Sequence, residues 1–273
     1  MSVKKTSSGD LVLRSFTLGY IGLLIILPVC AVASEAFKEG VVTIWHEVTL
    51  PQALVSLKLT FVMALIIVTI NIITGTATAW VLVRYEFPLK KFLNALIDLP
   101  FAIPTVVTGI MLVRLYGPKS IIGGFLKQFD IEMIFNKPGI VLALLFVTFP
   151  FVVRSVQPVF LEMEKEMEEA AQTLGATPVE IFFMIILPTL FPSMLTGAAL
   201  SLSRALGEFG SVVIVAGNIP FKTLVAPVYI YGEIESHNLP GATSVSLVLL
   251  AISFLILVAI HFFQKWSRRH ETA

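Results

Sequence analysis

Arg204 and Glu208 are the residues whose type and spacing most directly indicate chemistry, because they lie four positions apart in an otherwise apolar stretch. Charges at membrane depth cost roughly 2.5–3.5 kcal/mol each even on lenient insertion scales, so they usually face a bundle interior or a water-filled cavity. A spacing of four places both side chains on one face of a helix. One interpretation is an ion pair that fixes helix packing. The other is a contact of Arg204 with a charged solute.

A polar segment at 161–188 is the second such feature, and its residue types predict two helices joined by a turn. Its first half consists of strong helix formers with glutamates near the start, where acids favour the positive helix end. Gly175 is a typical helix stop, because glycine adopts the left-handed conformation without steric cost. Thr177 is then an N-cap, with Pro178 at the first helical position and Glu180 completing a capping box.

The predicted surface of this helix pair is built from small residues, which let another protein approach closely. A short amphipathic helix of this kind can dock into a groove. A solvated helical hairpin without a partner is the other interpretation. The residues concerned are Ala170, Ala171, Leu174, Gly175 and Ala176.

The composition places these features in a membrane protein. Of 273 residues, 56% are hydrophobic and 14% are charged, against about 25% charged in soluble domains. The mean hydropathy is +0.91. A net charge of +1 gives no indication of nucleic acid as a partner. A single Cys30, four scattered histidines and the lack of phosphate-loop, GxGxxG and HExxH motifs predict no metal, cofactor or nucleotide site in this chain.

Six stretches are long and apolar enough to cross a bilayer as helices. A signal peptide is the alternative for the first, but its apolar region exceeds the usual length of about 7–15 residues. The third is interrupted by Pro100 and Pro104. The predicted spans are 13–34, 58–83, 93–116, 139–157, 190–217 and 242–264.

Lysine and arginine predict the orientation, because cytoplasmic flanks carry the excess of these residues. With the N-terminus inside, the inner segments hold more of them than the outer loops, and six spans place both termini in the cytoplasm. The polar segment is then cytoplasmic. The inner residues are Lys4, Lys5, Arg14, Arg84, Lys90, Lys91, Arg154, Lys165, Lys265, Arg268 and Arg269, and the outer ones are Lys38, Arg114, Lys119, Lys127, Lys137 and Lys222.

The polar segment resembles a known motif at every fixed position. Glu169-Ala170-Ala171, Gly175 after three residues, Ile185 after nine more, and Leu187-Pro188 match the EAA loop of permease subunits of bacterial ABC importers. The resemblance implies an all-α polytopic membrane protein of six transmembrane helices, with the type I importer permease fold of a five-helix core plus an N-terminal helix. It also implies that the segment is a coupling helix seated in a separate ATP-binding subunit, and it adds Glu169 to the docking surface.

Further stretches are similar to the sulfate and thiosulfate importer permeases, among them "LPFAIPTVVTGI" (99–110), "RALGEFGSVVIVAGNIP" (204–220) and "GATSVSLVLLAISF" (241–254). Molybdate and tungstate permeases share the EAA loop and are the alternative. The implied division is 1–50 for the N-terminal tail, first helix and outer loop, 51–264 for the permease core with its coupling loop at 158–189, and 265–273 for a cytoplasmic tail.

The resemblance also implies the partners. These are a dimer of ABC ATPase subunits that bind ATP and magnesium, a second homologous permease or a second copy of this chain, and an extracytoplasmic sulfate-binding protein. The chain itself would be a transport subunit without catalytic residues or a cofactor, in the bilayer of the bacterial inner membrane. The outer loops 35–56, 117–138 and 218–240 would receive the binding protein.

An oxyanion cargo is compatible with the residues near Arg204. A tetrahedral dianion that must leave again would be met by hydroxyls and free backbone N–H groups at helix starts or breaks, with few cations. Such residues also serve ordinary packing between membrane helices, so both interpretations stay open. The candidate pathway residues are Thr105, Thr108, Ser201, Arg204, Glu208 and Ser211.

The sequence does not favour two other classes of function. A gradient-driven transporter usually has more spans or inverted repeats with paired broken helices, and the sequence shows no internal repeat. An intramembrane hydrolase needs a nucleophile in register with a base. His261 has no partner in a Gly-x-Ser-x-Gly run, so neither class is favoured.

Overall fold

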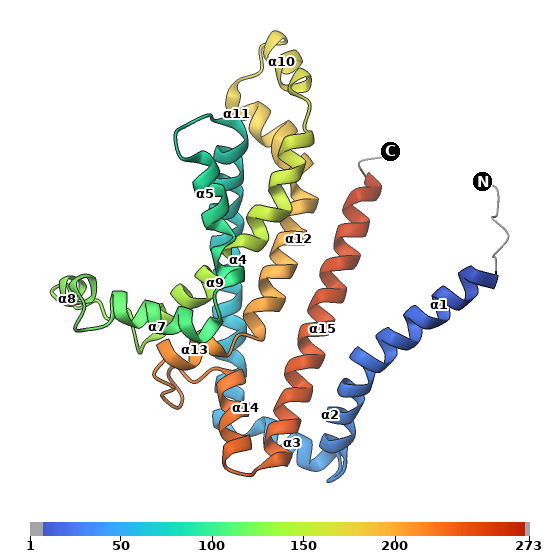
Figure 1. The fold of residues 1–273 in the computed structure, drawn as a ribbon, viewed down its shortest axis with the longest axis vertical. Coiled ribbons are helices and arrows are strands. Elements are labelled where there is room, and N and C mark those ends of the chain that lie inside the picture. Colours follow the sequence, from blue (N-terminus) through green and yellow to red (C-terminus); the bar gives the residue numbers. More distant parts are fainter. Residues whose placement is uncertain (1–7, 271–273) are drawn as a thin grey trace.

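The structure is a computed structural model that describes the backbone of residues 8–270 and the side chains within 9–262. In this range all regular secondary structure is helical, with long helices side by side and short helices across or at their ends (Figure 1). The elements are α1 (Ser8–Ile21), η1 (Gly22–Ile26), α2 (Leu27–Phe37), α3 (Val41–Thr49), α4 (Pro51–Arg84), α5 (Lys90–Ile97), α6 (Leu99–Ala102), α7 (Thr105–Tyr116), α8 (Ile121–Lys127), α9 (Lys137–Glu162), α10 (Lys165–Thr173), α11 (Pro178–Ile181), η2 (Phe182–Ile186), α12 (Leu187–Leu206), α13 (Gly210–Val215), α14 (Ala226–Glu235) and α15 (Leu239–His270).

The predicted membrane-spanning architecture is confirmed, with five helices long and apolar enough to cross a bilayer among the described residues, or six if the bent pair α7–α8 is one span. The predicted interruption of the span at 93–116 is confirmed, because the structure divides it into α5, α6 and α7. Pro100 and Pro104 explain the breaks. Proline lacks an N–H donor and disfavours helix in the residue before it, and Ile103 is extended at φ −89° and ψ 126°.

The span predicted at 190–217 continues the predicted helix that begins at Pro178, and only its part after Leu206 differs from the prediction. The helix begins with the capping box at Thr177 and continues through the π-helical turn η2 into α12. It ends at Leu206, and α13 starts a new direction after a break at 207–209 (Figure 1). Hydropathy does not detect this break, because both sides of it are apolar. A further short helix, α14, occupies part of the stretch expected to be an outer loop.

The centre of the bundle consists of α4, α9 and α12, which pack closely because glycines face the same residue of α9. A Cβ atom on Gly75 would lie 2.9 Å from Val152 Cβ, and one on Gly197 would lie 2.7 Å from Val152 Cα. Small residues allow this approach in a membrane, where van der Waals packing holds helices together. Two helices therefore meet α9 at the level of one valine.

A buried polar group ties the same three helices together. Asn71 Nδ2 of α4 donates to Thr148 Oγ1 of α9 at 2.7 Å and to Ser201 Oγ of α12 at 3.1 Å. All three side chains are fully buried. Hydrogen bonds between membrane helices contribute about 0.6 kcal/mol each on average, so this group adds more to the register of the helices than to their stability.

Helix α2 packs against α15, whereas Figure 1 shows α1 diverging from it. Both described ends of the chain lie at the end of the bundle that carries α10, while α3 and α14 lie at the opposite end (Figure 1). The predicted division at residue 50 coincides with Leu50, an extended residue between α3 and α4. That division stays a prediction, and residues 1–7 and 271–273 of its outer segments, including Lys4 and Lys5, lie outside the described residues.

Close packing at Gly197 makes a testable prediction. We expect Gly197→Ala to destabilise the protein by about 1–3 kcal/mol, because the new methyl group meets the backbone of α9. Thermal unfolding of the detergent-solubilised protein measures it. The matched control is Gly232→Ala in α14, where the methyl group meets nothing within 4 Å and should be neutral or stabilising. Equal effects of the two changes would contradict the packing described.

Candidate functional site

The polar segment forms the predicted helix, turn and helix. Gly175 has φ +89°, the left-handed region that glycine adopts without strain. The Ala176 N–H donates to Ala171 O at 3.0 Å, and the Gly175 N–H donates to Gln172 O at 3.0 Å. These two bonds make a Schellman motif, which satisfies the last carbonyl groups of α10.

The second helix begins with the predicted capping box. Thr177 Oγ1 accepts from the Glu180 N–H at 3.3 Å, and Glu180 Oε2 accepts from the Thr177 N–H at 2.7 Å. Both ends of the turn at 174–177 are therefore closed by local hydrogen bonds. A turn closed at both ends holds α10 and α11 at a defined angle.

The segment is also attached to the bundle, by a contact that the sequence did not indicate. Arg84 at the end of α4 forms an ion pair with Glu168 of α10 and donates to Met163 Sδ at 3.7 Å. Ala171 and Ala176 are partly buried against the apolar cluster at this end of the bundle. One side of α10 is thus anchored, and the residues of the pair are 84 positions apart, beyond the reach of local patterns.

The other side of α10 is open. Of the predicted docking residues, Glu169, Ala170, Leu174 and Gly175 are exposed, and Ala171 and Ala176 are half-buried. Leu174 at the turn is 88% exposed. Further exposed apolar side chains lie in α10, α11 and η2. They are Met167, Val179, Phe183 and Met184.

The Arg204–Glu208 pair lies at the break between α12 and α13. Arg204 Nη1 is 2.5 Å from Glu208 Oε2, so the predicted ion pair is present. Glu208 Oε1 accepts from both the backbone N–H and the hydroxyl of Ser211 at 2.8 Å. The side chain of Glu208 is 1% exposed, whereas that of Arg204 is 34% exposed. The carboxylate is therefore fully paired within the protein, while the guanidinium keeps one side open.

The start of α7 meets the same break. A Cβ atom on Gly210 would overlap Thr105 Oγ1, and one on Gly109 would lie 2.9 Å from Ser211 O. Thr108 is buried, and its hydroxyl has no hydrogen-bond partner among the described residues. Five of the six predicted pathway residues thus gather where α7, α12 and α13 meet. The sixth, Ser201, lies deeper, in the buried group with Asn71.

A second charged group, which sequence reasoning left unassigned, joins α5 to α9. Asp98 follows α5 and had no visible partner in the sequence. In the structure, Arg154 Nε and Nη2 each donate to one oxygen of its carboxylate at 2.7 Å. The two residues are 56 positions apart, so no periodicity could have paired them.

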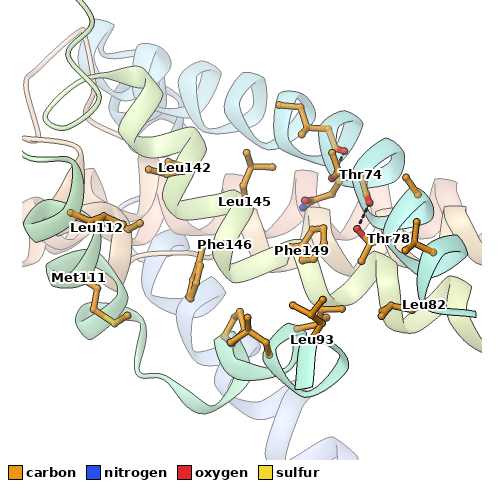
Figure 2. Close-up of a pocket in the computed structure, with 18 of the residues that line it drawn as sticks. Thr74, Thr78, Leu82, Leu93, Met111, Leu112, Leu142, Leu145, Phe146 and Phe149 are labelled. Carbon is orange, nitrogen blue, oxygen red and sulfur yellow. Dashed lines mark hydrogen bonds between the residues drawn. The ribbon is translucent and has the colours of Figure 1, made fainter. Parts of the chain in front are cut away.

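A cavity of about 1160 Å³ lies between α4, α5, α7 and α9. Figure 2 shows Phe146 of α9 and Met111 of α7 directed into it. Its wall is mostly apolar, with Asn71, Thr74, Thr78 and Arg114 among its polar residues, and none of the six predicted pathway residues lines it. The cavity is therefore separate from the break at Arg204.

The opposite end of the bundle carries a polar cluster of its own. Asn238 Nδ2 donates to Glu233 Oε2 at 2.6 Å and to Glu47 Oε2 at 3.3 Å. Burial, followed by hydrogen bonding to Glu233, raises the pKa of Tyr229 well above its ordinary value. These contacts join α3, α14 and the start of α15 into one ordered surface.

Sequence comparison identifies the chain's relatives. The family described as "Binding-protein-dependent transport system inner membrane component" matches residues 71–271. The "Sulfate transport system permease protein CysT" of Synechocystis sp. is 43% identical over 93% of this chain and 89% of its own length. The protein of the same name from Salmonella typhimurium is 41% identical over 94% of this chain and 96% of its own length.

Solved structures share the fold. A chain of a bacterial ABC transporter for the import of the acidic polysaccharide alginate has a TM-score of 0.77 at 16% identity, covering 94% of this chain and 96% of that chain. A chain of the MetNI methionine ABC transporter in an inward-facing conformation has a TM-score of 0.60 at 18% identity, covering 78% and 94%. The architecture therefore recurs among importer permeases whose sequences have diverged widely.

The Arg204–Glu208 pair makes a second prediction. We expect Arg204→Gln to lower the free energy of unfolding by about 1.5–3 kcal/mol, because Glu208 loses a charged partner but keeps both hydrogen bonds from Ser211. Glu208→Gln should cost less, since Arg204 is partly exposed. Denaturation in detergent micelles measures both single variants and the double variant. A coupling energy of at least about 1 kcal/mol is expected, and additive effects would contradict a direct pairing.

Proposed function

The chain belongs to the family of binding-protein-dependent transport system inner membrane components, and from this premise we propose that it moves sulfate into the cell as a subunit of an ATP-driven importer. The chain is a permease, a transport subunit and not an enzyme. Its relatives named as sulfate permeases cover nearly the whole chain, and this similarity supports the choice of sulfate. Molybdate is the alternative cargo.

The observation that carries the coupling mechanism is the segment 165–181, which is closed by caps, anchored on one side and apolar on the other. We propose that this segment docks into a separate ATPase subunit through Glu169, Ala170, Ala171, Leu174, Gly175 and Ala176. The anchored side transmits force to α4 and α9, because Glu168 pairs with Arg84. ATP and magnesium would be bound by a dimer of ATPase subunits.

The proposed orientation places α10 in the cytoplasm of a bacterial cell, with the membrane-embedded bundle in the inner membrane. Both described ends of the chain lie at the same end as α10 (Figure 1), which supports cytoplasmic termini. The opposite end, formed by α3, α14 and the start of α15, would receive an extracytoplasmic sulfate-binding protein. Its ordered polar contacts support that role, because docking onto an ordered surface costs little entropy.

The proposed anion contact is Arg204 at the break between α12 and α13. Its guanidinium has one described partner, Glu208 Oε2, so donors remain on its exposed side. Glu208 neutralises part of the charge, and transport needs binding that is weak enough for release. Thr105, Thr108 and Ser211 surround the break, while Ser201 supports it from the buried group. A second permease, homologous or identical, would complete the pathway, since this site is open on one side.

The docking surface makes a third prediction. We expect Leu174→Asn to reduce the amount of ATPase subunit that copurifies with the permease by roughly tenfold, because an apolar contact at the centre of an interface is worth about 1–2 kcal/mol. Quantitative purification of the complex measures this ratio. The matched control is Ile121→Asn in α8, which changes an equally exposed aliphatic residue away from α10. Equal recovery in both variants would contradict docking at this surface.

The anion contact makes a fourth prediction. In proteoliposomes containing the complete transporter, we expect Arg204→Gln to reduce uptake of labelled sulfate at least about tenfold. Arg204→Lys should retain more, since it keeps the positive charge. The amount of assembled complex is measured in parallel, and normal uptake by Arg204→Gln would overturn the assignment. Excess unlabelled molybdate should leave uptake unchanged, and strong competition would favour the molybdate alternative.

A further inference from the structure

Arg154 is the most completely bonded charged side chain among the described residues of α5 and α9. Nε and Nη2 donate to the two carboxylate oxygens of Asp98 at 2.7 Å. Nη1 donates to Asn94 Oδ1 at 2.9 Å and to Gln157 Oε1 at 2.5 Å, and Nη2 also donates to Asn94 O at 2.6 Å. A guanidinium has five N–H donors in a planar fork, and all five are used here.

This saturation separates Arg154 from Arg204. Every donor of Arg154 points to an acceptor of the protein, so the residue has none to offer an anion. Its bonds span two helices, because Asn94 and Asp98 belong to α5 and its C-terminal cap while Gln157 belongs to α9. Lysine cannot reproduce such a planar, bidentate geometry. The group is therefore a joint between two helices and not a ligand site.

The joint lies where few other contacts hold α5. Neither α5 nor α6 contains a buried residue. Their other described links to the bundle include the edge-on contact of Phe101 with Phe151 of α9, with ring centroids 5.1 Å apart, and the partly buried Ile97. Side chains that are this exposed contribute little apolar burial, so the polar group around Arg154 decides how α5 sits on α9.

The position of the joint connects the docking segment to the candidate anion site. At its C-terminal end α9 leads to α10 through only Met163 and Glu164, so a shift of α10 acts on α9 directly. On the other side of the joint, α6 leads through Ile103 and Pro104 to α7. Helix α7 packs against α13 beside Ser211, which bonds to Glu208.

We propose that Arg154 is a positioning residue that joins α5 to α9 through Asp98, so that a movement of α10 reaches the broken third helix and, through α7, the site at Arg204. The proposal rests on the proposed function, because it assumes that an ATPase moves α10. It assigns the bonded charge of α9, whose side chain is 29% exposed, to mechanical coupling rather than to substrate binding. Coupling of this kind runs through hydrogen-bond networks with discrete arrangements.

The first arm of the test measures transport per ATP. The complete transporter in proteoliposomes carries Arg154→Lys, Asp98→Asn, or the charge exchange Asp98→Arg with Arg154→Asp. ATP hydrolysis should stay within about twofold of the unaltered complex, while sulfate uptake per ATP falls at least about tenfold in the single variants and partly recovers in the exchange. The matched control is Glu86→Gln, which removes the exposed ion pair with Lys90 at the start of α5 and should change neither rate.

The second arm measures the helices directly and does not depend on the cargo. In a Cys30→Ser background, spin labels replace Phe92 of α5 and Leu161 of α9, both exposed. With Arg154 in place, the distance between the labels should be the same without nucleotide and with ATP and vanadate. In Arg154→Lys it should broaden or shift with nucleotide. Asn94→Ala, which removes a single acceptor side chain, should give an intermediate result and covers the case in which the other variants do not fold.

The outcomes separate the two proposals. An unaltered complex that hydrolyses ATP but takes up no sulfate contradicts the cargo, and the label distances still decide the role of Arg154. Unchanged uptake per ATP in Arg154→Lys overturns the proposed joint, and so do equal label distances in both nucleotide states of that variant. A loss of uptake in which ATP hydrolysis falls in the same proportion also overturns it, because that result indicates a structural role alone.

Discussion

Backbone groups and charges inside a bilayer have no water to bond, so each helix break must be satisfied by the protein itself. The described chain meets this constraint at two breaks. At 207–209 the carboxylate of Glu208 accepts the Ser211 N–H that the new helix leaves free. At 98–104 the carboxylate of Asp98 is held by Arg154. Proline and glycine thus cause the breaks. Charged side chains occur beside the breaks because the groups left unpaired there need hydrogen-bond partners. The candidate functional residues of the molecule are therefore concentrated at its helix breaks.

At the end that carries α10, polar groups can be hydrated, so they do not need partners from the protein. There the Schellman motif at Gly175 and the capping box at Thr177 serve to fix an angle and not to remove a desolvation penalty. The exposed apolar side chains of Met167, Leu174 and Val179 make this end suitable for an interface. The ion pair between Arg84 and Glu168 then links this surface to α4. A force applied to the turn would therefore reach α4 through this ion pair.

Sequence reasoning succeeded where the determinants are local. Residues within four positions of each other specify the turn at Gly175, the capping box and the Arg204–Glu208 pair, and the structure contains all three. It failed where apolar character continues across a change of direction, so the break after Leu206 was missed. It could not find contacts set by packing. Asp98 with Arg154, Glu168 with Arg84 and Ser201 with Asn71 are pairs that only the folded bundle brings together.

Arg154 and Arg204 illustrate how one residue type supports opposite tasks. Arg154 has five acceptors, so moving it would break several charge-assisted bonds at once, and the helices on either side are held as one body. Arg204 has one described acceptor and a side chain that is 34% exposed, so a passing anion can replace water at its free donors without breaking a protein bond. An arginine whose donors are all bonded within the protein holds two helices together. An arginine with free donors can make a transient contact with an anion. For an ion that must bind and then leave, the less satisfied arginine is the more suitable partner.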